Sequence, residues 1–126
     1  MSLKLYNVVA IVGSREFKNY EQMKREALKH LHADDEIVSG GALGADSMAQ
    51  RLAKEEGYDF HICYPKSKQH GWPASAFIRN KRIVEHADLV LAFYAKGRFQ
   101  QGGTANTAKW ARELNVPLLE FEEELL

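Results

Sequence analysis

Along the chain, short apolar runs typical of strands alternate with segments in which apolar residues recur at helical spacing. Short apolar runs, several of them rich in β-branched residues, predict five strands, over residues 8–12, 36–39, 59–64, 89–94 and 117–121. Between them, apolar residues recur at helical spacing and predict four helices, over residues 20–32, 45–56, 74–86 and 104–114. Strands that alternate with helices in this way favour right-handed crossovers and a parallel sheet covered on both faces. We therefore expect an α/β protein, a three-layer α/β/α sandwich with a mainly parallel five-stranded sheet.

The segments between these elements are polar. Residues 66–73 and 96–103 are expected to be loops, and the acidic residues 122–126 are expected to form a short helical turn. No internal repeat or linker interrupts the pattern, so we expect a single nucleotide-binding domain over residues 1–126. The first residues lack the pattern of a signal peptide, and no apolar stretch is long enough to span a membrane. We expect a cytoplasmic protein without a membrane partner.

Composition and charge narrow the classes of function. Lys and Arg, 17 together, balance the 17 Asp and Glu, whereas a chain that coats nucleic acid usually carries a basic excess. The balance argues against a nucleic-acid partner, although a local basic patch could still bind one. The single cysteine, Cys63, cannot form an intrachain disulfide. Because the five histidines show no ligand-like grouping, we expect no metal. We also expect no cofactor other than a nucleotide-derived ligand.

Three glycine-rich segments follow predicted strands, at residues 13–15, 39–46 and 101–107. In open α/β sheets, ligands bind outside the carboxyl ends of the strands, so these segments are expected to share one edge. Glycines leave backbone N–H groups uncovered, and the start of a helix directs such groups at an anion. Each segment could equally be a simple tight turn, but three of them at one edge favour a phosphate site. The candidate ligand-binding residues in and beside these segments are Gly13, Ser14, Arg15, Ser39, Gly40, Gly41, Ala42, Gly44, Asp46, Arg79, Asn80, Gly102, Gly103, Thr104 and Asn106.

Two common nucleotide-binding motifs are not matched by these segments. A Walker loop requires a Lys directly after its last glycine, and no Lys follows Gly44. The dinucleotide fingerprint requires a glycine where Ser39 stands. The sequence therefore argues against a P-loop ATPase and against a conventional NAD dehydrogenase.

Several charged and aromatic side chains near the segments have two interpretations. Arg15 follows the first glycine and Arg79 lies in the helix before the fourth strand, where each could bind an anion or be an ordinary surface residue. Asp46, in the first turn of a helix, could interact with the helix dipole, contact ribose hydroxyls or act in catalysis. Trp72 and Tyr64 could stack on a base or pack against the protein. Further cations near this edge are Lys66, Lys68 and Arg98.

Taken together, residues 10–15 (AIVGSR), 38–46 (VSGGALGAD), 79–80 (RN) and 102–104 (GGT) resemble the SLOG superfamily, and most closely its YspA-like branch. The resemblance implies a Rossmann-like fold, a nucleotide-derived ligand and self-association as a homodimer or higher homo-oligomer. Relatives include the LOG phosphoribohydrolases and the DprA proteins, which load single-stranded DNA. Arg79 matches the catalytic Arg of the LOG enzymes, whereas Asn80 and Thr107 stand where those enzymes carry a Lys and a catalytic Glu. This argues against hydrolysis by the LOG mechanism.

Three functions are compatible with these residues. We expect first a sensor or sequestering module that binds a phosphate-bearing nucleotide or nucleotide derivative, such as an ADP-ribose-like signal. The alternative is a hydrolase of the N-glycosidic or phosphate bond of such a ligand, in which Asp46 supplies the carboxylate and Arg79 stabilises negative charge. The second alternative is a protein that binds single-stranded nucleic acid in the same groove.

Overall fold

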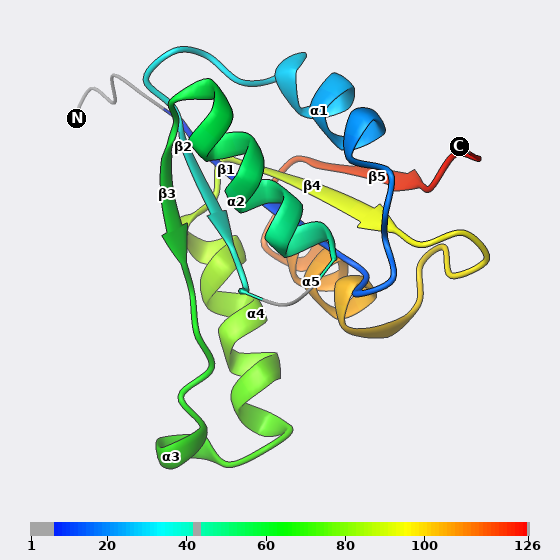
Figure 1. The fold of residues 1–126 in the computed structure, drawn as a ribbon. Coiled ribbons are helices and arrows are strands. Elements are labelled where there is room, and N and C mark those ends of the chain that lie inside the picture. The colour runs from blue at the N-terminus through cyan, green and yellow to red at the C-terminus, as the bar shows by residue number, and fades with distance from the viewer. Residues whose placement is uncertain (1–6, 42–43, 126) are drawn as a thin grey trace.

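The computed structural model describes residues 7–41 and 44–125 of the chain. Within these ranges, five strands form one sheet in the order β3-β2-β1-β4-β5, with helices packed against it (Figure 1). The strands are β1 (Val8–Gly13), β2 (Glu36–Ser39), β3 (Asp59–Ile62), β4 (Leu89–Tyr94) and β5 (Leu118–Glu122). The helices are α1 (Tyr20–Leu28), α2 (Ala45–Glu56), α3 (Ser67–His70), α4 (Ala74–His86) and α5 (Gly102–Glu113). The expected α/β fold is confirmed, and each neighbouring pair of strands is parallel.

Strand β1 lies at the centre of the sheet because its apolar run can be buried on both faces. Residues 8–12 are all buried, and β1 pairs with both β2 and β4. Successive side chains of a strand point to opposite faces. Val9 and Ile11 accordingly belong to the core beneath α1 and α2, whereas Ala10 and Val12 belong to the core beneath α4 and α5.

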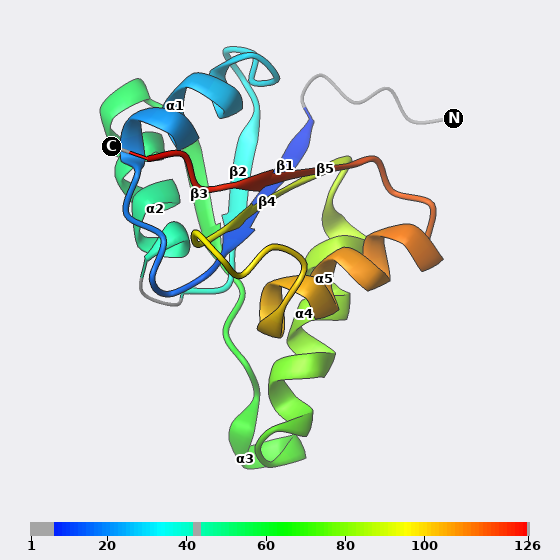
Figure 2. The same cartoon turned by 90° about the vertical axis from the view of Figure 1, so that its right-hand side faces the viewer.

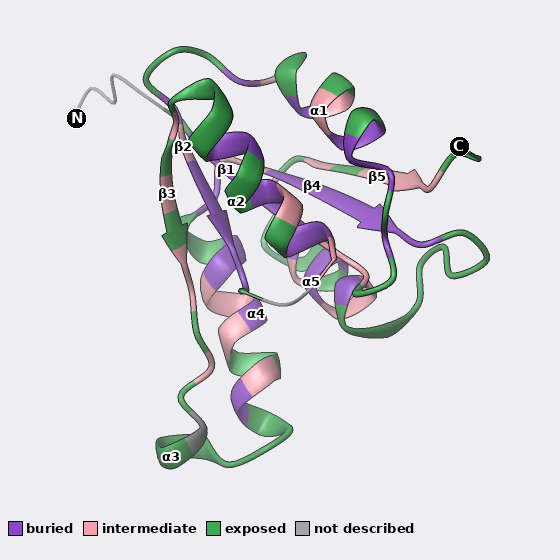
Figure 3. Ribbon diagram, viewed as in Figure 1, coloured by how far each residue is buried: buried purple, intermediate pink, exposed green. Residues whose placement is uncertain are grey.

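The helices form two layers around the sheet. Helices α1 and α2 cover one face, and α4 and α5 cover the other, as the view along the side shows (Figure 2). Figure 3 shows that β1, β2 and β4 are largely buried between these layers, while the outer sides of the helices are exposed. None of the helices in the described ranges is long and apolar enough to cross a membrane. The three-layer arrangement that the alternating pattern predicts is confirmed.

Helix α1 ends at Leu28, about one turn before the end that the apolar spacing predicts. The buried Leu31 follows it outside the helix. The side chain of Asp35 explains the early end, since its carboxylate accepts the backbone N–H of His32 at 2.9 Å and that of Asn7 at 2.9 Å. A short polar side chain that captures backbone groups in this way competes with helix continuation and turns the chain into β2.

Further boundaries differ from the prediction. Helix α5 begins at Gly102, two residues before its predicted start, so the loop after β4 is shorter than expected. Strand β3 ends at Ile62, not at Tyr64, because its neighbour β2 ends at the paired residue Ser39. The expected loop over residues 66–73 contains the short helix α3. The predicted helical turn over residues 122–126 is wrong, since Glu122 belongs to β5 and residues 123–125 are irregular.

The order of the strands reverses between β1 and β4. From β1 the chain continues to β2 and β3 on one side, and it then crosses to β4 and β5 on the other side. At such a point the loops after two neighbouring strands diverge and leave a crevice outside the carboxyl edge of the sheet. Figure 1 shows α3 and the first turns of α4 projecting past this edge. The fold therefore places the segments after β1 and β4 beside the start of α4.

Candidate functional site

A cavity of about 350 Å³ opens at the carboxyl edge of the sheet. The segments after β1, β2 and β4 contribute to its wall, together with α4 and the start of α5. The sequence-predicted residues that line it are Gly13, Ser14, Arg15, Gly40, Asp46, Arg79, Asn80, Gly102, Gly103 and Thr104. The structure thus brings parts of all three glycine-rich segments to one cavity.

Ser14 fixes the segment after β1 by two hydrogen bonds to the end of β4. Its backbone N–H donates to the carbonyl of Phe93 at 3.0 Å, and its Oγ accepts the N–H of Ala95 at 3.0 Å. Both partners lie at the end of β4. The Ser14 hydroxyl oxygen is therefore used to join the two loops at the switch point, and Arg15 extends from a segment that is held in place.

Other residues of the second glycine-rich segment serve close packing and do not line the cavity. A Cβ atom at Gly44, where φ is +73°, would lie 2.2 Å from the carbonyl oxygen of Arg15. The N–H of Ala45, the first residue of α2, donates to the carbonyl of Ser14 at 3.2 Å. This backbone N–H group at the start of α2 is therefore hydrogen-bonded within the protein and is not left for a ligand.

Four further predicted positions lie away from the cavity wall or outside the described residues. Ser39 is fully buried, and its Oγ accepts the N–H of Gly41 at 3.5 Å. A Cβ atom at Gly41 would lie 2.7 Å from a methyl group of Ile62, so this glycine packs against the end of β3. Asn106 does not line the cavity, but its Oδ1 accepts a hydrogen bond from Nδ2 of Asn80, which does. Ala42 lies outside the described residues.

Arg79 of α4 ties the ends of two strands to its helix. Its Nη1 donates to the carbonyl of Gly40 at 2.7 Å and to that of Cys63 at 3.4 Å. Its Nε donates to Oδ1 of Asn80 at 2.9 Å. Burial lowers the pKa of Arg79, while the negative charge of the buried Asp46 acts in the opposite direction. Both charged groups flank Gly40, because a Cβ atom there would lie 2.8 Å from Arg79 Nη1 and 3.2 Å from Asp46 Oδ2.

The start of α5 is open toward the cavity. Apart from its chain neighbours and the backbone of its own helix, no atom of the described residues lies within 4 Å of the position that a Cβ atom would take at Gly102 or at Gly103. The first N–H groups of a helix have no partner within the helix, and they lie at the positive end of its dipole. Behind this turn, Nδ2 of Asn80 donates to Oδ1 of Asn106 at 3.0 Å and to the carbonyl of Gly103 at 3.5 Å. The arrangement leaves an anion-attracting helix end on the cavity wall.

Exposed aromatic side chains complete the cavity on the side of α4. Trp72 is 68% exposed and Phe77 is 47% exposed, and both line the cavity. The spacing of apolar residues predicts that Phe77 and Ile78 face the core, but Ile78 is also 38% exposed. Phe77 and Ile78 lie in the first two turns of α4, and Trp72 lies just before the helix. Figure 1 shows this end of α4 projecting past the sheet. Sequence spacing alone carries no signal for how far a helix overhangs its sheet.

The charged residues of the wall give it a positive excess. The arginines Arg15, Arg79 and Arg98 line the cavity, against the carboxylates of Glu16 and Asp46. Arg15 and Arg98 are exposed. Within the described ranges, no group of three or more His, Cys, Asp and Glu residues could hold a metal ion. The cavity can therefore attract an anion through arginines and a helix start.

Comparisons with known proteins place this fold in a family. No curated protein is a significant match to the chain. A solved structure of DNA processing protein A from Helicobacter pylori, described with its single-stranded DNA binding mode, matches with a TM-score of 0.68 and 24% sequence identity. The match covers 94% of this chain and 66% of that one, so the chain spans about two thirds of the length of its structural relative. These findings confirm the SLOG and DprA-type part of the resemblance, and the YspA-like branch stays a prediction. Since the model of the DNA recombination-mediator protein A family matches residues 1–101, the chain belongs to that family.

Proposed function

We propose that the chain binds single-stranded DNA at the cavity on the carboxyl edge of its sheet. The observation that carries the proposal is the gathering of three arginines and two exposed aromatic side chains around one cavity. Membership of the DNA recombination-mediator protein A family supports this choice of ligand, as does the likeness to a protein described as binding single-stranded DNA.

The first interpretation of the sequence, a sensor for a small nucleotide derivative with no nucleic-acid partner, is wrong. The family match and the DNA-binding structural relative contradict it, together with the alternative of a nucleotide hydrolase. The error comes from the net charge of zero, which averages over the whole surface. A polyanion responds to the local excess of arginines on one face, and acidic residues elsewhere in the chain hide that excess from the sum.

The phosphate groups of a DNA strand would be held by the cations and by the start of α5. Arg15 and Arg98 are exposed at the cavity, so their guanidinium groups can reach a backbone that passes along it. The open turn at Gly103 adds backbone N–H groups and the positive end of the helix dipole. Contacts of this kind bind without regard to sequence and weaken as salt concentration rises.

The aromatic side chains would distinguish an unpaired strand from a duplex. Bases of single-stranded DNA can stack on exposed rings, whereas the bases of a duplex already stack on one another. Trp72 and Phe77 expose large ring surfaces beside the cations of the same cavity. A binding groove for single strands requires this combination of cations with stacking surfaces.

The proposal is tested by fluorescence anisotropy with a labelled oligothymidylate of about 15 nucleotides. We expect Trp72→Ala to weaken binding by about 1–3 kcal/mol, the value of one lost stacking contact. We expect Arg15→Ala to weaken binding as well and to reduce the slope of log affinity against log salt by about 0.7, as the loss of one phosphate contact predicts.

The controls are two exposed residues remote from the cavity. Leu114→Ala, at the end of α5, matches the loss of an exposed apolar side chain, and Lys54→Ala, on the outer side of α2, matches the loss of a cation. Both variants are expected to bind as the parent protein does. The proposal fails if the parent protein does not bind the oligonucleotide at low salt, or if the cavity variants bind no more weakly than the controls.

A further inference from the structure

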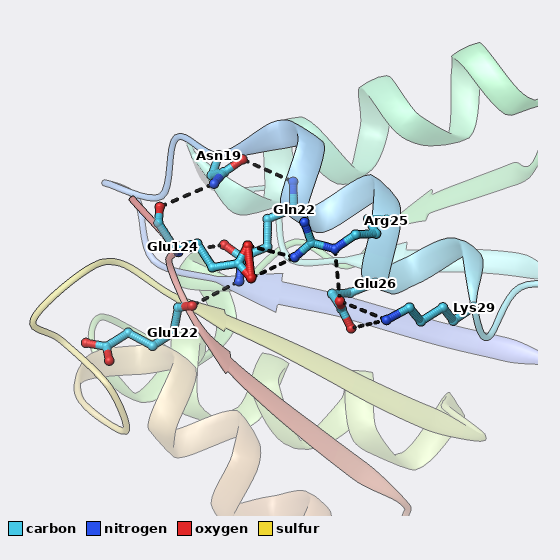
Figure 4. A network of polar contacts seen from close by, with 7 residues as sticks. All are labelled: Asn19, Gln22, Arg25, Glu26, Lys29, Glu122 and Glu124. Carbon is cyan, nitrogen blue, oxygen red and sulfur yellow. Dashed lines mark hydrogen bonds and ion pairs between the residues drawn. The ribbon is translucent and has the colours of Figure 1, made fainter. Parts of the chain in front are cut away.

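The chain that follows β5 packs along the start of α1 through a set of hydrogen bonds (Figure 4). The side chain of Gln22 donates to the carbonyl of Glu122 at 2.9 Å and accepts the N–H of Glu124 at 2.9 Å. The side-chain amide of Asn19 donates to the carbonyl of Glu124 at 3.2 Å, and Arg25 binds the Glu124 carboxylate at 2.7 Å and 2.8 Å. These contacts hold residues 122–124 in one path across the molecule.

The intervening residue, Glu123, connects two loops with its carboxylate. Oε2 accepts the backbone N–H of Lys18 at 2.6 Å and that of Asn19 at 2.9 Å. Oε1 accepts the backbone N–H of Lys96 at 3.3 Å. The neighbouring Glu122 adds a parallel contact, since its Oε2 accepts the N–H of Gly97 at 2.9 Å. A carboxylate that accepts several backbone N–H groups is a charge-assisted connection, stronger than one between neutral groups.

The two connected loops are the ones that carry exposed arginines of the cavity. Arg15 lies between Ser14 and Lys18 in the loop after β1, and Arg98 lies just beyond Gly97 in the loop after β4. Ser14 already joins these loops at their β-strand ends through the N–H of Ala95. The Glu123 carboxylate joins the same loops farther out, and Glu122 adds a contact to the second loop. The backbone is therefore held on both sides of Arg15 and directly before Arg98.

We propose that Glu123, assisted by Glu122, is a positioning residue of the DNA site, which it serves by fixing the loops that carry Arg15 and Arg98. This inference rests on the proposed function. Glu123 lies beyond residues 1–101, the part of the chain that the family model matches. Whether removal of the Glu123 carboxylate weakens or strengthens DNA binding distinguishes a positioning role from a purely electrostatic effect. Removal of a carboxylate near a polyanion site should strengthen binding by electrostatics alone, whereas loss of a positioning contact should weaken it.

The test compares Glu123→Ala, Glu123→Gln and Glu124→Ala in the anisotropy assay with single-stranded oligothymidylate. The first two remove the same charge, but glutamine retains an acceptor oxygen at the same reach. We expect Glu123→Ala to weaken binding about tenfold and Glu123→Gln to recover part of the loss. The salt slope of Glu123→Ala should fall by about 0.7 for each arginine that no longer contacts a phosphate, a change that a uniform loss of folded protein would not produce.

Glu124→Ala is the matched control, because it removes a neighbouring carboxylate whose hydrogen bonds go to Arg25 of α1 and not to the backbone of the two loops. It should bind as the parent does or slightly more tightly. Amide hydrogen exchange of the free protein gives an independent readout, in which Lys18 and Lys96 should exchange faster in Glu123→Ala than in the parent. If Glu123→Ala does not fold, the affinity and the amide exchange of Glu123→Gln are compared with those of the parent protein, and weaker binding with faster exchange supports the positioning role.

Two failures are distinguishable. Absence of oligonucleotide binding by the parent protein would remove the proposed function itself. A parent that binds, with Glu123→Ala and Glu123→Gln binding equally well or more tightly, would overturn the positioning role while leaving the DNA site intact. Equal weakening by Glu123→Ala and Glu124→Ala would also overturn it, because the effect would then follow the packing of the C-terminal segment on α1 and not the connection between loops.

Discussion

Glycine residues near the cavity have different surroundings, which the sequence alone does not reveal. A Cβ atom at Gly13 would lie 2.4 Å from the carbonyl oxygen of Phe93 and 2.4 Å from the Cβ of Ala45, both inside the packed core. At Gly103, apart from its chain neighbours and its own helix backbone, no atom of the described residues lies within 4 Å of the same position. The sequence presents both residues as parts of glycine-rich segments. Only the structure shows that Gly13 permits packing between β1, β4 and α2, while Gly103 leaves open space toward the cavity.

This difference makes a prediction at the scale of single residues. Gly13→Ala should lower the free energy of unfolding by about 1–3 kcal/mol or more, because core atoms must move to admit the methyl group. Gly103→Ala should leave the stability unchanged or raise it by up to about 1 kcal/mol, since alanine is the better helix residue. Urea denaturation followed by circular dichroism measures both variants. Equal stability of Gly13→Ala and the parent protein would contradict the close contact at the end of β1.

At the scale of elements, the sequence predicts best those segments whose ends depend on local signals. Helix α2 ends, as predicted, before Gly57, which adopts a left-handed conformation with φ of +79°. Helix α1 instead ends early, because Asp35 accepts a backbone N–H group that would otherwise continue the helix. The C-terminal segment is held by side chains of α1, which are distant from it in the chain. The spacing of apolar residues does not depend on such contacts, so a prediction based on it misplaces these boundaries.

The N-terminus of α1 yields a prediction at this scale. Asn19 is its N-cap, with Oδ1 accepting the N–H of Gln22 at 3.0 Å while Nδ2 donates to Glu124. Asn19→Ala should destabilise the protein by about 1–2 kcal/mol, because both the cap and the tie to the C-terminal segment are lost. Asn19→Ser should lose less, since its hydroxyl can still cap the helix. Thermal or urea unfolding checks the order, and equal losses in the two variants would show that the cap contributes little.

For the molecule as a whole, the sequence predicts the shared cavity better than it predicts the class of ligand. Three glycine-rich segments after parallel strands correctly indicate one shared cavity, because the carboxyl ends of such strands meet at one edge. The exposed surface of Phe77 could not be predicted, since it depends on how far α4 extends past the sheet. Nor does a net charge of zero reveal that arginines gather on one face. The proposed choice of a DNA strand over a small nucleotide therefore depends on properties of the assembled surface, which the sequence does not reveal.

The same two properties of the whole molecule predict a preference for single strands over duplexes. A chain with a net charge of zero has little general attraction for a polyanion, so binding must depend on the cavity itself. With the proposed function, part of the affinity would come from stacking of unpaired bases on Trp72 and Phe77, to which a duplex has no access. We expect a duplex of the same length to compete at least about tenfold more weakly than the single strand, which corresponds to about 1.4 kcal/mol.

The combined variant Trp72→Ala/Phe77→Ala should lose most of this discrimination while retaining a salt dependence from the arginines. Competition with unlabelled single-stranded and duplex DNA measures the ratio, and equal competition by the two forms with the parent protein would show that the aromatic side chains do not select the ligand.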